Sequence, residues 1–288
     1  MFTTLISAQQ LAERIADPEL RIIDCRFSLA DPEAGRSAYS QGHIPGAVYA
    51  HLDEDLCAPI IPGQTGRHPL PDKDFMIQKF TDWGIDDSVQ VVAYDDKTSM
   101  VASRLWWMLR YLGHTRVAVL DGGFAAWTAL PDAPVSLDVP NVESRAFRPG
   151  TQVGQVFSAD DVERIRQDAA FILVDSREGF RYRGESEPID PVAGHIPGAV
   201  NAFFMENLDE GGRFLPAECW TGCPPNSLYF IVDQAFRHVI TCWPSLMPAW
   251  AMRVCMPVPG ANGLRMGRGL WGGCSFGFKV SRSGFHRA

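Results

Sequence analysis

The chain has 288 residues, which is long enough for two domains of ordinary size. Hydrophobic residues make up 46% and charged residues 21%, a composition that excludes a disordered or fibrous chain. The net charge of −8 favours no particular class of partner, and no stretch approaches the roughly 20 apolar residues of a membrane-spanning helix.

The first half predicts strands that alternate with helices. Ser7 is an N-cap that opens a helix, and the apolar run that follows, ending in Asp24-Cys25-Arg26, predicts a buried strand. We expect further strands at 91–94 and 117–120, with a helix at about 99–112 between them. This alternation favours a parallel sheet covered by helices on both faces. Residues 134–150 contain three prolines and predict a linker.

The second half repeats the first. Gly-His-Ile-Pro-Gly-Ala-Val occurs at residues 42–48 and again at 194–200. An apolar run ending in Asp-x-Arg returns at 171–177, and Ser158-Ala159 repeats Ser7-Ala8. The chain is therefore a duplication of one α/β unit.

These repeated motifs, with Gly-Gly-Phe-x-x-Trp at 122–127, resemble the rhodanese family over residues 5 to about 218. The duplicated form resembles thiosulfate and 3-mercaptopyruvate sulfurtransferases. The resemblance implies that a cysteine at a strand-to-helix turn of the second domain accepts a sulfane sulfur as a persulfide. The sulfur then passes to cyanide or a thiol, without a metal or organic cofactor, and the first domain is inert.

The expected fold is α/β with two rhodanese-like domains, each a parallel sheet flanked by helices. The first domain spans residues 1–133, the linker 134–150, and the N-terminal part of the second domain 151–218. Residues 219–288 form a tail, so we expect the second domain to be truncated, to lack two parallel strands and to be disordered after about residue 218.

The candidate nucleophile position of the first copy holds Asp95, directly after the strand at 91–94. A thiolate there would be stabilised by backbone amides and a helix N-terminus. A carboxylate cannot carry a sulfane sulfur, so we expect Asp95 to cap the following helix.

Arg181 matches the segment whose arginine helps to bind the anionic substrate in the family that the chain resembles. A guanidinium group suits carboxylate or sulfonate oxygens. An ion pair with Glu185 or Glu187 is the equally supported alternative.

The strand-end residues Asp24, Arg26, Asp175 and Arg177 are expected to be structural, because hydrogen bonds between them would close the ends of the strands. His43 and His195 lie in a turn that both copies share, and the inert first copy argues that neither histidine is catalytic.

The tail changes in character. From Cys219 onward it has one acidic residue against seven lysines and arginines, and no Cys-x-x-Gly loop follows an apolar strand. Read one base out of frame, the codons from residue 228 permit Val-Phe-Tyr-Cys-Gly-Ser-Gly-Val, the missing loop of the family. Its cysteine is encoded across the Ile231 and Val232 codons, so we expect no catalytic cysteine and an inactive chain. The second copy is also 15 or 16 residues shorter between turn and strand, as a deletion near residues 217–225 would produce.

Three alternatives stay open. The frameshift is a sequence error and the native protein is active, or the first domain is a non-catalytic binding module. The third is a zinc site formed by Cys219, Cys223, His238 and Cys242, whose spacing suits the metal; we expect none. The expected partners are a small-molecule sulfur donor and a thiophilic acceptor, with no nucleic acid and no membrane. Without an export signal at the N-terminus, we expect a cytoplasmic protein.

Overall fold

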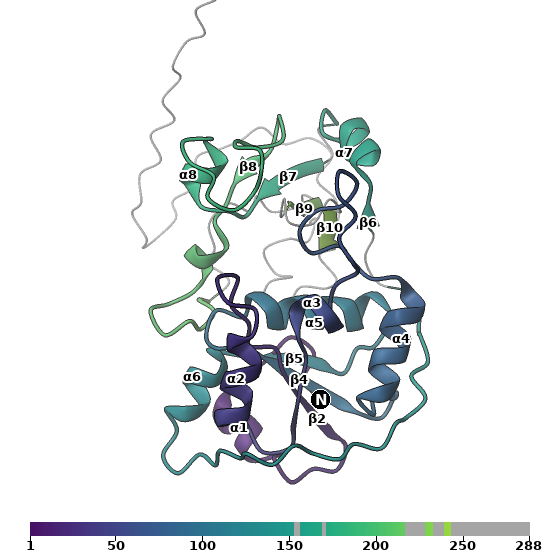
Figure 1. Ribbon diagram of the computed structural model, residues 1–288, viewed down its shortest axis with the longest axis vertical. Helices are drawn as coiled ribbons and strands as arrows, with labels where there is room; N and C mark the ends of the chain where they lie inside the picture. The colour runs from purple at the N-terminus through teal and green to yellow at the C-terminus, as the bar shows by residue number, and fades with distance from the viewer. Residues whose placement is uncertain (153–155, 169–170, 217–227, 233–238, 243–288) are drawn as a thin grey trace, which may run out of the picture. The chain divides into compact units, whose positions relative to one another are not determined.

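The computed structural model describes every residue except 153–155, 169–170, 217–227, 233–238 and 243–288 (Figure 1). The described residues form two five-stranded sheets, one from each copy of the repeat. Helices flank the first sheet, which confirms the α/β class. The expected segments at 91–94, 99–112 and 117–120 are found as β4, α5 and β5, with ends that differ by one residue at most.

The first sheet has the strand order β1-β5-β4-β2-β3, and all of its pairs are parallel. The strands are β1 (Leu5–Ile6), β2 (Leu20–Asp24), β3 (Ala47–Tyr49), β4 (Gln90–Tyr94) and β5 (Val117–Leu120). The helices are α1 (Ala8–Ala12), α2 (Ala34–Gln41), α3 (Leu52–Asp55), α4 (Lys73–Asp82), α5 (Met100–Tyr111) and α6 (Gly123–Thr128). Each strand therefore ends at the same edge of the sheet, where its loop can carry functional groups.

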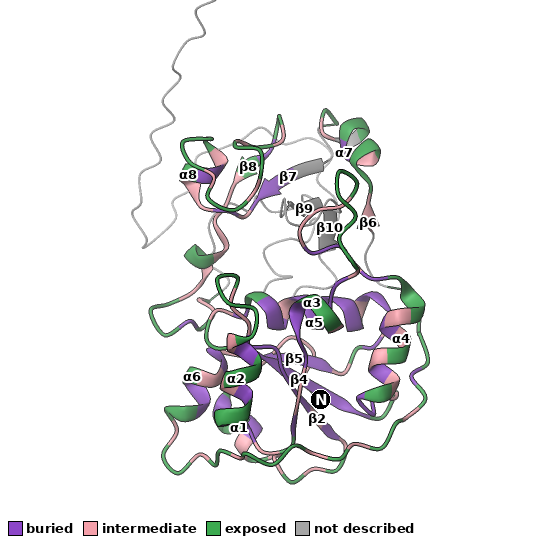
Figure 2. Ribbon diagram, in the orientation of Figure 1, coloured by how far each residue is buried: buried purple, intermediate pink, exposed green. Residues whose placement is uncertain are grey.

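The core of the first domain lies on both faces of this sheet, because successive strand residues point to opposite sides. Ile23 of β2 packs in the cluster that contains Phe80 of α4, while its neighbour Ile22 packs with Leu11 of α1 and Trp127 of α6. The strands are buried throughout their centre (Figure 2). Burying one such aliphatic side chain stabilises the fold by about 1.5–3 kcal/mol. Because buried clusters cover both faces of the sheet, the first domain has a complete core.

The second sheet has the strand order β6-β10-β9-β7-β8. The strands are β6 (Val156–Phe157), β7 (Phe171–Asp175), β8 (Val200–Asn201), β9 (Leu228–Val232) and β10 (Val239–Cys242), with α7 (Ala159–Ile165), α8 (Gly179–Tyr182) and the 3-10 helix η1 (Phe204–Asn207). Strand β9 pairs in parallel with β7, with Val232 opposite Asp175, as Tyr94 lies opposite Asp24 in the first sheet.

Two segments of the tail thus differ from the expectation, since β9 and β10 are ordered into the sheet. The rest of residues 219–288 lies outside the described residues. Strand β10 occupies the place that β5 has in the first sheet, yet it runs antiparallel to both β9 and β6. A parallel crossover needs a dozen or more residues, and only 233–238 separate β9 from β10. The short connection therefore dictates the reversed direction.

The expected linker is bound to the first domain over its whole length. Ser136 exchanges backbone hydrogen bonds with His43, and Arg145 forms an ion pair of 2.9 Å with Glu19. Phe147 is buried in the first core. These contacts hold residues 134–150 against the first domain.

No helix among the described residues is long and apolar enough to cross a membrane.

Candidate functional site

The end of β2 carries a buried ion pair. Arg26 donates from Nε and Nη2 to the Asp24 carboxylate, with a shortest distance of 2.7 Å, and Nη2 also donates to the Gly42 carbonyl. The Tyr94 hydroxyl donates to Asp24 Oδ2 at 2.6 Å. Asp24 and Arg26 are 0% and 3% exposed, and the guanidinium lies 4.3 Å from the ring centroid of Phe124. The pair ties the strand end to the turn at 42–48.

The second copy builds the same unit at the end of β7. Arg177 Nη2 donates to Asp175 at 2.6 Å and to the Gly194 carbonyl at 2.7 Å. Arg177 also contacts Glu187 through Nη1 at 3.2 Å. The two copies therefore hold their strand ends in the same way.

The two histidines of the repeated turn make equivalent contacts. His43 stacks on Tyr39 with ring centroids 3.9 Å apart, and His195 stacks on Tyr182 at 3.8 Å. Nδ1 of each histidine lies within 2.8 Å of the carbonyl oxygen of the stacked tyrosine. Each tyrosine hydroxyl in turn donates to the carbonyl of the alanine in the turn. This is a packing motif that positions the turn.

Asp95 follows β4 and lies at the start of α5. Its carboxylate accepts hydrogen bonds from the backbone amides of Ser99 (2.8 Å), Val101 (3.0 Å) and Ala102 (3.3 Å). Burial raises the pKa of Asp95, and the three amide hydrogen bonds oppose that rise. These contacts are those of a helix cap, as expected for Asp95.

The corresponding strand of the second sheet is β9, because it pairs with β7 as β4 pairs with β2. Asp233 follows β9 in the sequence, as Asp95 follows β4. Residue 233 lies outside the described residues, as do Cys219, Cys223 and His238, whose spacing suits zinc but for which no site is expected. In the sequence, neither residues 95–99 nor residues 233–238 include a cysteine.

Arg181 lies in α8 and is buried, with 5% of its surface exposed. Its Nε donates to both carboxylate oxygens of Glu187 at 3.0 Å, and Nη2 donates to Asp190 Oδ2 at 2.8 Å. Glu185, the other partner considered, pairs with Arg183 instead. The guanidinium is therefore paired with the carboxylates of Glu187 and Asp190.

The cysteines whose surroundings the structure describes are Cys25 and Cys57, and both are buried. Burial raises the pKa of Cys25, and the nearby carboxylates of Asp24 and Asp95 raise it further. Burial also raises the pKa of Cys57 to about 11. Neither thiol is a nucleophilic thiolate at neutral pH.

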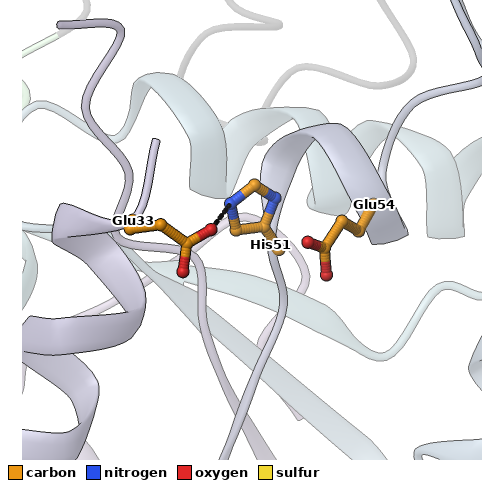
Figure 3. Close-up of side chains that lie close together, drawn as sticks. All are labelled: Glu33, His51 and Glu54. Atoms are coloured by element: carbon orange, nitrogen blue, oxygen red, sulfur yellow. Dashed lines mark ion pairs between the residues drawn. The ribbon is translucent and has the colours of Figure 1, made fainter. Parts of the chain in front are cut away.

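A cluster of Glu33, His51 and Glu54 brings three possible metal ligands together (Figure 3). His51 has both ring nitrogens in use, since Nδ1 accepts from the Asp53 amide and Nε2 lies 3.1 Å from the Pro32 carbonyl. Both glutamates pair with Arg36. These donor atoms do not fit a metal ion, because the imidazole offers no free lone pair.

Several partners of the site residues were not predicted from the sequence. These partners are Tyr94, which donates to Asp24, Asp190, which accepts from Arg181, and Ser99, whose amide donates to Asp95. They come from segments distant from the repeated motifs or without a motif of their own. Only Tyr94 could have been found from the sequence, because it is the last residue of a strand expected next to the Asp-x-Arg strand.

Comparisons with known proteins agree with this architecture. The family model of the rhodanese-like domain matches residues 7–130. A protein of Pseudomonas aeruginosa named as a probable 3-mercaptopyruvate sulfurtransferase is 47% identical over 220 residues, which are 74% of this chain and 75% of that protein. The thiosulfate sulfurtransferase of Rattus norvegicus is 32% identical over 223 residues, 74% and 73% of the two chains.

The crystal structure of SseA from Escherichia coli, a 3-mercaptopyruvate sulfurtransferase structure, superposes with a TM-score of 0.66 and 28% identity. The match covers 76% of this chain and 81% of SseA. Fold and strand-end motifs thus define a tandem α/β protein of the sulfurtransferase class. The chain belongs to the rhodanese family.

Proposed function

We propose that the gene encodes a sulfurtransferase and that this chain, as written, has lost the activity. In the family reaction a cysteine persulfide carries a sulfane sulfur from 3-mercaptopyruvate or thiosulfate to cyanide or a thiol. The loss of activity is proposed because an aspartate, and no cysteine, stands at the start of the loop that follows the corresponding strand in each copy. Asp95 fills the first loop with a carboxylate, and Asp233 follows β9 where the second loop begins.

A shift of reading frame would account for the loss of the loop. The shifted codons permit Cys-Gly-Ser-Gly-Val, with the cysteine encoded across the Ile231 and Val232 codons, after a strand that remains apolar in both frames. Strand β9 supports this reading, since Leu228–Val232 pairs with β7 as the strand before a catalytic loop would. The donor and acceptor are small molecules, so the proposal includes no nucleic acid and no membrane, and it places the protein in the cytoplasm.

Arg181 is proposed to bind the anionic end of the donor in the complete enzyme. A carboxylate or sulfonate of the substrate would exchange for the carboxylate of Asp190 or Glu187, which now occupy the guanidinium. In this chain the arginine is instead held by these two acids.

The experiment compares this chain with a frame-restored protein, in which the missing codons near residue 217 are supplied and the alternative frame is read. Sulfur transfer is measured with thiosulfate and with 3-mercaptopyruvate, using cyanide as the acceptor. We expect turnover only from the frame-restored protein, and none after its loop cysteine is replaced by serine. Equal activity of this chain would mean that one of its own cysteines does the chemistry, and the proposal would be wrong.

A non-catalytic binding module is the second candidate, and the complete core of the first domain favours it. Its test is a stable fragment 1–150 that binds a specific ligand. A fragment that unfolds, or that binds nothing from a panel of oxyanions and thiols, would exclude it.

A further inference from the structure

Residues 134–140, which we call the edge segment, run extended along the outside of the first domain after α6 (teal in Figure 1). The even-numbered residues bind the domain through main-chain atoms. Ser136 exchanges backbone hydrogen bonds with His43 at 2.9 and 3.0 Å, and the Asp138 carbonyl lies 3.1 Å from His43 Nε2. The Pro134 carbonyl accepts from the indole of α6 at 2.9 Å. Contacts at every second residue are the pattern of a strand with one edge bound.

The odd-numbered residues of the edge segment, Val135, Leu137 and Val139, face away from the domain. Their side chains are 50%, 66% and 75% exposed. Within the part of the chain that the structure describes, their main-chain amides and carbonyls make no hydrogen bond. Single apolar residues are ordinary on a surface, but here three of them accompany a row of unpaired backbone groups. The segment therefore presents an open β edge, to which another strand can be added.

The prolines at the two ends of the edge segment leave this edge open. A proline lacks the N–H group, so it protects an edge only where that donor would point outward. Pro134 and Pro140 occupy even-numbered positions, at which the alternation turns the main-chain groups towards the domain. The outward donors at residues 135, 137 and 139 are therefore all kept.

The sequence of the edge segment is symmetric about Leu137. It reads Pro-Val-Ser-Leu-Asp-Val-Pro, so the valines and the prolines lie at equal distances from the centre. Two identical strands that pair antiparallel about a two-fold axis there place residue 137 opposite itself and residue 135 opposite residue 139. Apolar side chains then meet apolar side chains along the whole outer edge.

The same register is also favourable for charge. Asp138 is the one charged residue of the edge segment, and its position is mirrored by Ser136. In the symmetric pair each Asp138 faces a serine rather than the other aspartate, so the two carboxylates are kept apart. The Ser136 hydroxyl accepts from the Asp138 amide of its own chain at 2.9 Å, and its hydrogen remains free to be donated to the carboxylate opposite.

We propose that the edge segment is a self-association site, to which a second copy of this chain adds its own edge segment, antiparallel and centred on Leu137. Each odd-numbered residue exchanges a pair of backbone hydrogen bonds with an odd-numbered residue of the second copy. Their side chains lie on one side of the strand and form cross-strand pairs around the two-fold axis. This association does not depend on sulfur transfer.

The size of the contact sets its strength. Stable complexes bury about 1,200–2,000 Å², and two strands of this length bury less, which is typical of weak, reversible association. We expect a Kd on the order of 100 µM, so association is measured by sedimentation equilibrium from about 10 µM to 1 mM chain, under reducing conditions.

Two double variants of the full-length chain test the register. Val135→Lys/Val139→Lys places like charges opposite each other and should weaken association about tenfold or more. Val135→Lys/Val139→Glu replaces the same two exposed valines but places opposite charges together, so it should associate at least about tenfold more tightly than the first variant. Thermal melts monitored by circular dichroism check that both variants fold as the unaltered chain does.

A mixing experiment tests the two-fold axis at Leu137. Leu137→Lys and Leu137→Glu each set a charge against its own copy, so each alone should stay monomeric over this range. An equimolar mixture should associate, because lysine then faces glutamate. If a Val135/Val139 variant does not fold, this mixture decides.

An unaltered chain that stays monomeric up to about 1 mM would overturn the proposal, because the edge would then belong to another partner or to none. Association that both Val135/Val139 variants share equally would also overturn it, since the contact would lie elsewhere in the chain. A mixture of the two Leu137 variants that associates no better than either alone would do the same.

Discussion

Replacing Arg26 with methionine tests how the strand-end ion pair stabilises the first domain. Methionine has a similar length but no charge and no donors. In the variant the Asp24 carboxylate keeps the hydrogen bonds from the Tyr94 hydroxyl and from the backbone amide of residue 26. It loses the guanidinium, and the Gly42 carbonyl loses its donor.

The expected cost follows from burial. Asp24 is 0% exposed and Arg26 is 3% exposed, so the carboxylate is left as an uncompensated charge in the interior. Removing one partner of such a pair costs about 3–5 kcal/mol. A domain is usually stable by about 5–15 kcal/mol, so Arg26→Met should lose a large part of the free energy of unfolding. The double variant Asp24→Asn/Arg26→Met should recover about 1 kcal/mol or more, because no charge is then buried.

Urea unfolding monitored by tryptophan fluorescence measures the effect. Four of the eight tryptophans lie in the first copy of the repeat and the other four follow residue 218, so the measurement uses a background in which the four later tryptophans are replaced by phenylalanine. With a denaturant slope of about 1–3 kcal/mol per molar urea, the midpoint should fall by roughly 2 M. The duplication supplies a matched control, Arg177→Met, which breaks the equivalent pair in the second copy and should leave the first-domain transition in place.

If the free energy of unfolding of Arg26→Met, obtained from the midpoint and the slope, lies within about 0.5 kcal/mol of that of the unaltered chain, the reasoning is refuted. A double variant less stable than Arg26→Met would refute it as well. In that case the pair contributes specificity to the turn rather than stability.

Three further predictions concern the first domain. Burial lowers the pKa of His68 to about 4, below the value of about 6.5 in the unfolded chain, so the stability that neutral His68 contributes is complete above pH 6.5 and is lost as the pH falls towards 4. The free energy of unfolding from urea titrations should drop by up to about 3 kcal/mol over this range, reduced by the attraction of Asp53, whose carboxylate lies 3.3 Å from His68. A His68→Gln variant that keeps the full pH dependence would contradict this. Ser99→Gly should raise the free energy of unfolding by about 0.5–1 kcal/mol because glycine adopts the left-handed conformation without strain, whereas Ser99→Ala should not show that gain in thermal melts. Arg104→Met should speed proteolysis at residues 58–67, because Arg104 now donates to the carbonyls of Leu56 and of residues 68 and 69; unchanged cleavage rates would show that the loop is held by other contacts.

The strand and helix order of the first domain could be predicted from the sequence, because it depends on local patterns. A buried parallel strand is a short apolar run, as at Gln90–Tyr94, and the N-cap serines stand directly before their helices. The ion pairs at the ends of β2 and β7 were also predictable, because their members are two residues apart. The repeat fixed the family for the same reason, as it needs only the order of residues.

The direction of β10 was decided by tertiary constraints. The sequence led us to expect a truncated second domain that is disordered after about residue 218, because the family pattern stops there. Once β9 pairs with β7, the edge of the sheet offers unpaired backbone groups, and β10 satisfies them through a connection too short for a parallel return.

The chemistry of the candidate site divides in the same way. The sequence alone determined that an aspartate follows each of the strands β4 and β9, at residues 95 and 233, since this is a matter of residue identity. Only the tertiary structure decided that three amides converge on Asp95 and that Glu187 and Asp190 occupy Arg181. Such contacts depend on how a loop folds back on its helix and on which side chains burial forces together, and no spacing in the sequence encodes that geometry.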